Sequence, residues 1–520
     1  MRSPPYAGAW SRRALLAGMV GAALSPACKT RGTSRVHFPA DPFLLGVASG
    51  YPTPDGFSLW TRLAPVPLDP VGGMEPLPVD VVLEVAEDDT FAKVVHKARL
   101  SAVAELSHSV HGDVRGLRPD RWYQYRFRSG DAVSAVGRTR TAPAIDAAPA
   151  RLRFAIGSCQ HFEHGWYVAH RHLCDEDLDL MLFLGDYIYE GSGSTDAVRR
   201  YEGGGPRTLG EYRVRHAQHR TDPDLQRLHG AVPWLLTWDD HEVYNDWAGE
   251  QGEDRDPAFM ERRAAAFQAW FEHMPVPLHM TPNGPSLKVY GSVSFGQLAR
   301  FTMLDDRQYR TPQACPRPGR GGSNVVDAAA CPDLTDPART MLGAEQERWL
   351  DATFAASREQ WNLIGQQTLM APFDARDDEG QQSWTDGWEG YPEPRRRLLA
   401  SMHSRGLSNP IVLGGDVHTT YVADLHLEPR DPTSPIVASE FTCTSISSRG
   451  GTPESSADFL RINPRFKYVN GWQRGYLTFD LTPDDCTARV RAVDVKDPAS
   501  GVETVATFRV MSGTPGAIRV

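Results

Sequence analysis

Five short apolar stretches in this sequence are each followed directly by side chains that could bind a metal or move a proton. The stretches and the residues after them are 152–156 with Cys159, 178–184 with Asp186 and Tyr189, 232–238 with Asp239, Asp240, His241 and Glu242, 300–304 with Arg307, and 410–413 with Asp416 and His418. Ligands of open α/β sheets bind outside the carboxyl ends of strands, so we expect these side chains to converge. Carboxylates brought that close raise one another's pKa, and a bound cation is the usual resolution. The sequence therefore predicts a metal site.

The side chains at these strand ends form two kinds of donor set. Thiolate, phenolate and imidazole favour a redox-capable or borderline transition metal, and Fe³⁺ is the natural partner of phenolate and thiolate together. Carboxylate and amide oxygens favour Ca²⁺, Mg²⁺ or Mn²⁺. Two neighbouring metals can stabilise the attacking and the leaving oxygen of an in-line displacement, which is the logic of phosphate ester hydrolysis.

The elements that must position these side chains change in character near residue 150. Residues 38–143 look all-β, because 79–85 is strand-like and 122–127 alternates with period two, and short strands at this spacing suggest a β-sandwich. Residues 144–150 form a plausible linker. From residue 151 to about 510, apolar runs mix with helical segments at 258–274 and 343–354. This pattern predicts an α/β or α+β catalytic domain with a buried sheet.

Length and composition set the outer limits. The chain has 520 residues, for which the length prior is about three domains. Hydrophobic residues make up 41% and charged residues 23%, an ordinary globular composition that excludes collagen, coiled coil and wholesale disorder. The formal net charge is −10, so the chain lacks the overall basic character of a nucleic-acid-binding protein.

The N-terminus is typical of an export signal. Arg12 and Arg13 precede a mild apolar run of about eleven residues, shorter than the roughly 20 that span a bilayer. We interpret residues 1–30 as a twin-arginine signal, a route that carries proteins already folded with their cofactors. Cys28 is a candidate for lipid anchoring, but Ser25 stands where lipoprotein signals usually place Leu, so simple cleavage is the preferred interpretation.

The cysteine pattern fits an exported protein. Cys315 and Cys331 bracket a Gly/Pro-rich loop of fifteen residues, and we expect a disulfide between them. Cys174, Cys443 and Cys486 cannot be paired from the sequence.

Taken in order, the strand-end motifs resemble those of the PhoD-type alkaline phosphatase/phosphodiesterase family within the calcineurin-like metallophosphoesterases. The matching motifs are Gly157-Ser-Cys-Gln160, Gly185-Asp-Tyr-Ile-Tyr189, Thr237-Trp-Asp-Asp-His-Glu-Val243 with Asn245, and Gly414-Gly-Asp-Val-His418. The resemblance extends from Leu45 to about Leu481. It implies an α/β fold in which a fibronectin-III-like β-sandwich over 38–143 precedes a catalytic domain over 151–510, built as a two-sheet sandwich flanked by helices.

The resemblance also implies a ligand set. Cys159, Asp186, Tyr189 and His418 would hold iron, and Asp186 would bridge to calcium. The calcium would be held also by Asp240, Asn245 and Asp416, with Asp239 in support. Mn²⁺ or Zn²⁺ remains an alternative.

Four further sets of residues have expected roles around this site. We expect His241 to act as an acid near the leaving oxygen, oriented by Glu242. Arg307 either binds phosphate bidentately or pairs with Asp305 or Asp306. Arg449 is a weaker phosphate-binding candidate, and the aromatic group of Trp384, Trp388 and Tyr391 is expected to pack within a loop.

Together these features predict an exported phosphoester hydrolase of the alkaline phosphatase type, which uses a metal-bound hydroxide or oxide as nucleophile. A phosphodiesterase or phospholipase D-like activity on the same site is the alternative, and a non-enzymatic, metal-containing cell-envelope binding protein is a more distant one. The expected partners are a phosphate ester substrate and the twin-arginine export machinery, without nucleic acid or a transmembrane span. We expect a monomer in the periplasm or outside the cell.

Overall fold

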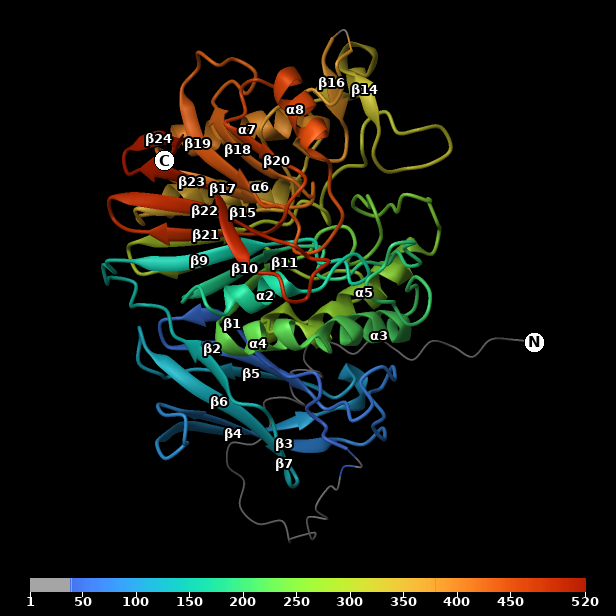
Figure 1. Cartoon of the computed structure of the whole chain (residues 1–520), viewed down its shortest axis with the longest axis vertical. Coiled ribbons are helices and arrows are strands. Elements are labelled where there is room, and N and C mark those ends of the chain that lie inside the picture. Colours follow the sequence, from blue (N-terminus) through green and yellow to red (C-terminus); the bar gives the residue numbers. More distant parts are fainter. Residues whose placement is uncertain (1–37, 39, 379) are drawn as a thin grey trace, which may run out of the picture.

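The computed structural model describes residue 38, residues 40–378 and residues 380–520. The predicted export signal, with Arg12, Arg13 and Cys28, lies outside the described residues. The described chain is built from two large β-sheets packed face to face, with helices on their outer sides and a smaller sheet at the N-terminal end (Figure 1). Within the described part of the chain, no helix combines the length and hydrophobicity needed to cross a bilayer.

The larger sheet has ten strands in the order β24-β23-β22-β21-β9-β10-β11-β1-β2-β5. Its strands are β1 (Val47–Thr53), β2 (Gly56–Arg62), β5 (Ser109–Val114), β9 (Leu152–Gly157), β10 (Leu180–Leu184), β11 (Trp234–Thr237), β21 (Arg474–Leu481), β22 (Asp485–Val493), β23 (Val502–Met511) and β24 (Thr514–Arg519). The three central strands β9, β10 and β11 run parallel, so their carboxyl ends share one edge. The C-terminal strands continue the sheet in antiparallel pairs.

The second sheet has seven strands in the order β12-β13-β15-β17-β19-β18-β20. They are β12 (Gly291–Phe295), β13 (Ala299–Met303), β15 (Trp361–Gly365), β17 (Pro410–Gly414), β18 (Thr420–His426), β19 (Ile436–Thr442) and β20 (Tyr468–Asn470). The strands β13, β15, β17 and β19 are parallel. A short pair, β14 (Val325–Asp327) and β16 (Gln382–Trp384), lies outside both sheets. The five apolar stretches identified in the sequence therefore belong to two sheets: three end in the first and two in the second.

The N-terminal region forms a sandwich, but one of its two sheets is shared. The sheet of its own contains β3 (Val79–Ala86), β4 (Val94–Ala102), β6 (Trp122–Ser129), β7 (Ala132–Val133) and β8 (Gly137–Arg140). It packs against β1, β2 and β5 through a core that includes Phe57, Val81 and Tyr125. Since β1 pairs with β11 at Gly50 and Trp234, the facing sheet continues into the larger domain. The N-terminal region is thus joined to the rest by a continuous sheet as well as by a linker.

The helices cover the outer faces of the two large sheets. On the side of the ten-stranded sheet lie α2 (Val168–Leu173), α3 (Leu209–Arg220), α4 (Pro223–Ala231) and α5 (Phe259–His273), whereas α6 (Gly343–Ala356), α7 (Pro392–Ser404) and α8 (Pro453–Ile462) accompany the seven-stranded sheet (Figure 1). The helix α3 begins at a capping box, in which Thr208 and Glu211 satisfy each other's backbone N–H groups. The helices predicted over 258–274 and 343–354 are confirmed as α5 and α6.

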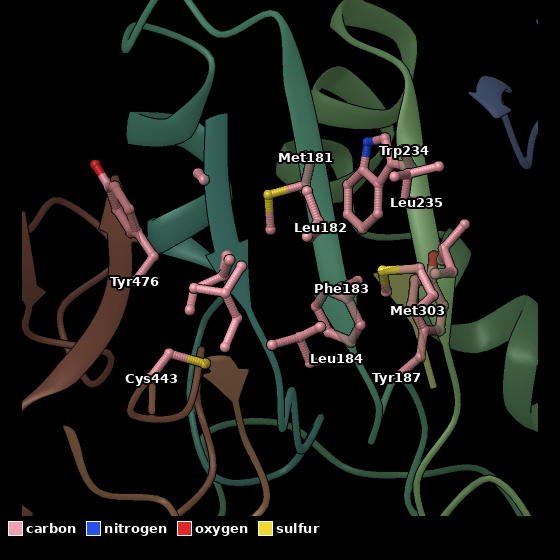
Figure 2. Close-up of a cluster of buried hydrophobic side chains, with 14 of the residues drawn as sticks. Met181, Leu182, Phe183, Leu184, Tyr187, Trp234, Leu235, Met303, Cys443 and Tyr476 are labelled. Atoms are coloured by element: carbon pink, nitrogen blue, oxygen red, sulfur yellow. The ribbon is translucent and has the colours of Figure 1, made fainter. Parts of the chain in front are cut away.

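The main hydrophobic core fills the space between the two sheets. Phe154 on β9 packs edge-to-face on Phe301 of β13, with ring centroids 5.2 Å apart. Figure 2 shows the buried side chains of β10, from Met181 to Leu184, among Trp234, Met303 and Cys443. Because interiors of this kind are close-packed, the two sheets hold their strand ends in a fixed relation to each other.

Candidate metal and active site

Potential metal ligands from both sheets converge at the carboxyl ends of their strands. Four groups each bring at least three ligand atoms within 4.8 Å of one another, and they are Cys159–Asp186–His418, Asp186–Asp240–His241, Asp239–Asp240–Asp416 and Asp240–Asp246–Asp386. Asp186 and Asp240 belong to more than one group, which makes the cluster continuous. The predicted convergence of the strand-end side chains is therefore observed, although it takes two facing sheets to produce it.

The backbone at this cluster is unusual. Cys159, Asp186, Asp416 and His418 all have left-handed backbone angles, with φ between 50° and 64°. Non-glycine residues enter this region rarely, at a cost of order 1–3 kcal/mol each, and such residues gather at functional sites. These residues turn the chain sharply just after β9, β10 and β17. All four are among the metal ligands predicted from the sequence.

Tyr189 lies at the centre of the mixed-donor part of the cluster. Its hydroxyl donates to Oδ2 of Asp186 at 2.8 Å and lies 2.9 Å from Nε2 of His418. The hydroxyl of Ser448 donates to the Tyr189 oxygen at 2.8 Å. Burial raises the pKa of Tyr189 and of the Cys159 thiol well above their usual values, and the Asp186 carboxylate adds to both effects. A cation bound here would oppose this rise because it stabilises the deprotonated ligands.

The carboxylates of the cluster lie close together, and their hydrogen-bond donors do not compensate for all of the negative charge. Burial raises the pKa of Asp186 and of Asp416 well above the usual range, and neighbouring carboxylates raise them further. Oδ2 of Asp239 and Oδ2 of Asp416 are buried without a hydrogen-bond partner among the described residues. Buried carboxylate oxygens without a donor are costly unless a cation satisfies them, so the residues present fit a metal site.

Arg307 is the main cation of the cluster and is almost fully buried. Its Nε lies 2.5 Å from Oδ1 of Asp239, and its Nη1 lies 2.7 Å from Oδ2 of Asp386. Of the two alternatives for Arg307, the ion pair to Asp305 or Asp306 does not form, because the Asp305 carboxylate instead accepts from the backbone N–H of Arg307 at 3.1 Å and caps that turn. Its Nη2 lies 3.9 Å from Oδ1 of Asp240 and from Oδ2 of Asp416, so all three nitrogens of the guanidinium face carboxylates, and the geometry favours ion pairing over direct phosphate binding.

His241 is oriented by a residue that the sequence did not indicate. Its Nδ1 lies 2.6 Å from Oε2 of Glu190, whose other oxygen accepts from the backbone N–H of Asn245 at 2.9 Å. Burial lowers the pKa of His241, but Glu190 and other carboxylates together raise it well above its usual value. The expected orienting role of Glu242 is wrong, since its carboxylate accepts from the backbone N–H groups of Asp186, Tyr187 and Asp239.

The carboxylates of Asp246 and Asp386 were also missed by the sequence. Asp246 follows Asn245 directly, and Asp386 lies in a loop after β16 that no periodicity marks. Both are buried, and Arg310 holds Asp386 from the side opposite Arg307. For Asp246 the only available signal was its place beside a predicted ligand.

Several other residues singled out in the sequence lie outside the cluster or at its rim. Arg449 pairs with Asp196 at the exposed rim. Trp388 and Tyr391 are buried in loop packing, where the Trp388 indole donates to Oε1 of Gln366 at 3.0 Å. The predicted disulfide between Cys315 and Cys331 is confirmed. Cys159, Cys174, Cys443 and Cys486 are free.

Comparison with known proteins agrees with this geometry. Residues 154–490 match the model of the PhoD-like phosphatase family, and residues 27–143 match the model of the N-terminal domain of the same family. The chain belongs to the PhoD-like phosphatase family. It is 40% identical to alkaline phosphatase D of Bacillus subtilis (strain 168) over 496 residues, which cover 93% of this chain and 83% of that protein.

The fold is shared with a solved member of the family. The structure described as that of PhoD superimposes with a TM-score of 0.88 at 40% identity and covers 93% of each chain. These findings confirm the resemblance and the α/β fold class, and they identify the chain as a phosphoester hydrolase.

Proposed function

We propose that this chain is a metal-dependent phosphate ester hydrolase of the alkaline phosphatase type, with a mixed iron and calcium site. The observation that carries the proposal is the convergence of a thiol, a phenol, an imidazole and several carboxylates on one continuous cluster. The name of the Bacillus relative, alkaline phosphatase D, supports the reaction class.

Each ligand in this proposal follows from its donor atom. Cys159, Tyr189 and His418 would hold iron together with Asp186, because thiolate, phenolate and imidazole suit Fe³⁺. Asp186 would also reach the calcium, since it belongs to the group that contains Asp240. Asp240, Asn245 and Asp416 would complete an oxygen-rich site suited to Ca²⁺. When bound, the two metals would lower the pKa of water and absorb charge on the phosphate oxygens.

The protein's own side chains would supply the remaining steps. His241 is held at Nδ1 by Glu190, and its other ring nitrogen would protonate or hydrogen-bond the leaving oxygen. Arg307 would keep Asp239 and Asp386 ionised and fixed behind the site. By accepting from backbone N–H groups, Glu242 would set the direction of the strained turn after β10 and of the turn after β11.

The experiment that tests the function is a comparison of three substrate classes: a phosphomonoester, a phosphodiester and a phospholipid. The proposal expects hydrolysis of the monoester, lost in the Asp186→Ala variant. Hydrolysis of the diester or phospholipid alone would support the phosphodiesterase or phospholipase D-like alternative. Metal-loaded protein that turns over none of them would support a non-enzymatic binding protein and contradict the proposal.

Export by the twin-arginine route, with cleavage near Cys28, is part of the same proposal and rests on the sequence alone. Arg12 and Arg13 should be required together, so a variant with both Arg12→Lys and Arg13→Lys should stay inside the cell. Normal export of that variant would contradict the route. Lipid found on Cys28 of the mature protein would show anchoring in place of simple cleavage.

A further inference from the structure

The residue before Cys159 connects that thiol to a second buried thiol. Oγ of Ser158 lies 3.2 Å from Sγ of Cys159 and 3.3 Å from Sγ of Cys443. All three side chains are completely buried. A buried hydroxyl that bridges two sulfurs therefore lies next to the sulfur of one of the proposed metal ligands.

Both large sheets contribute to this bridge. Ser158 and Cys159 follow β9 of the ten-stranded sheet, whereas Cys443 follows β19 of the seven-stranded sheet. The backbone N–H of Cys443 donates to the carbonyl of Gly414 at 2.9 Å, and that of Ile446 donates to the carbonyl of Ser158 at 2.9 Å. Figure 2 shows Cys443 within the buried hydrophobic cluster. The three groups are thus held by backbone bonds and core packing, and their separation is fixed.

The absence of a side chain at Gly415 leaves room for the hydroxyl of Ser158. A Cβ at this position would lie 2.6 Å from Oγ of Ser158, closer than real contacts allow. The backbone just after β17, which also carries Asp416, therefore packs against the Ser158 side chain, in addition to the two sulfurs. The hydroxyl has little freedom to turn away from the two sulfurs.

The hydrogen count fixes the direction of the bonds when a metal is bound. A serine hydroxyl carries one hydrogen and two acceptor lone pairs, and a cysteine binds metal as a thiolate without a hydrogen. The Cys159 sulfur can then only accept, so the Ser158 hydroxyl would donate to it. The lone pairs of Ser158 would in turn accept the S–H of Cys443. On metal binding the thiol proton of Cys159 would pass to solvent, without any oxidation.

We propose that Ser158 is a positioning residue for the Cys159 sulfur and that Cys443 fixes the direction of the Ser158 hydroxyl. This inference rests on the proposed role of Cys159 as a metal ligand. A hydrogen bond to a ligating atom orients it and withdraws electron density from it. Loss of such outer partners typically costs about 10–100-fold in metal affinity.

The test uses the full-length mature protein, stripped of metal and reloaded with Co²⁺, and it reads the thiolate-to-cobalt charge-transfer band and the Co²⁺ affinity. Ser158→Ala should shift the band to lower energy, because the sulfur loses a hydrogen bond, and should weaken Co²⁺ binding about 10–100-fold. Cys443→Ala should shift the band in the same direction by less, and Cys443→Ser, which keeps a donor, should restore it.

Two matched substitutions serve as controls. Ser439→Ala removes a buried hydroxyl on β19 that has no hydrogen-bond partner among the described residues, and Cys486→Ala removes a buried free thiol on β22. Both should keep the wild-type band and affinity.

The outcomes separate this inference from the proposed function. If Cys159→Ser leaves the band intact, Cys159 is not the ligand and the proposed metal site is wrong. If Cys159→Ser abolishes the band but Ser158→Ala leaves its position and the affinity unchanged, the metal site stands and the role of Ser158 is refuted. If Ser158→Ala does not fold, the test is the comparison of Cys443→Ala with Cys443→Ser. The same energy of the charge-transfer band in both variants would overturn the proposal.

Discussion

Replacing Glu190 with glutamine tests the proposed role of His241 as an acid. The substitution removes the negative charge beside His241 but keeps the shape of the Glu190 side chain. The amide oxygen of the new side chain can still accept from the backbone N–H of Asn245, so the loop should keep its conformation. What is lost is the charge-assisted contact of 2.6 Å to Nδ1 of His241. Hydrogen bonds to charged groups are worth about 1.5–3 kcal/mol, which corresponds to roughly 10–150-fold in rate if the full contact acts in the transition state.

The assay compares kcat/KM for an alkyl phosphate and for p-nitrophenyl phosphate. An alkoxide needs a proton to leave and p-nitrophenolate hardly does, so Glu190→Gln should lose about 10–150-fold on the alkyl ester and much less on the aryl ester. His241→Ala should show the same contrast, with a loss of about 10²–10⁴-fold on the alkyl ester. Both variants should keep their metals.

A double-variant cycle completes this test. If Glu190 acts only through His241, adding Glu190→Gln to His241→Ala should cost little more. Equal losses on both esters would refute the acid role and indicate phosphate binding by His241. Loss of metal from His241→Ala would instead make the imidazole a ligand, in line with its place in the group of Asp186 and Asp240.

Three further predictions follow from the contacts described above. Asp186→Ala should lose metal and activity together, measured by elemental analysis and phosphomonoester turnover; an active, metal-loaded variant would contradict its shared position in two ligand groups. Burial raises the pKa of Glu359, but hydrogen bonds from Ser294, from the backbone N–H of Arg358 and from Arg300 outweigh burial and lower the pKa from 4.5 to about 2. Glu359 should therefore contribute about 1 kcal/mol of stability above pH 4.5 that is lost as the pH falls towards 2. The difference in unfolding free energy between wild type and Glu359→Gln should therefore narrow from pH 7 to pH 3, and a constant difference would refute the pairing. Cys315→Ala with Cys331→Ala should reduce stability in chemical denaturation by about 3 kcal/mol, as expected for a loop of this length, and an unchanged midpoint would show that the loop is constrained by other contacts.

The sequence predicted which strand ends carry the site residues, but not how those strands pair into sheets. Apolar runs that end in Cys159, Asp186, Asp240 and Asp416 were visible because strands and their terminal side chains are local features. Their division between two sheets was not, because strand pairing depends on contacts distant in sequence.

The side-chain partners that the sequence predicted wrongly or missed also depend on contacts between residues distant in sequence. Glu242 was expected to orient His241 because it is adjacent in sequence, yet its carboxylate faces the turn that follows β10. Glu190 is separated from His241 by 51 residues and reaches it only because β10 and β11 are parallel neighbours. The carboxylate at Asp386 pairs with Arg307 across 79 residues. Contacts of this kind follow from the fold and carry no local signal.

The measurement that tests the central claim most directly is metal analysis of natively purified protein, combined with its visible spectrum and phosphomonoester turnover. The donors at Cys159, Tyr189 and His418 predict iron together with calcium, and a ferric phenolate predicts a visible charge-transfer band that is lost in Tyr189→Phe. Colourless, active protein that contains only zinc would contradict the mixed iron and calcium site.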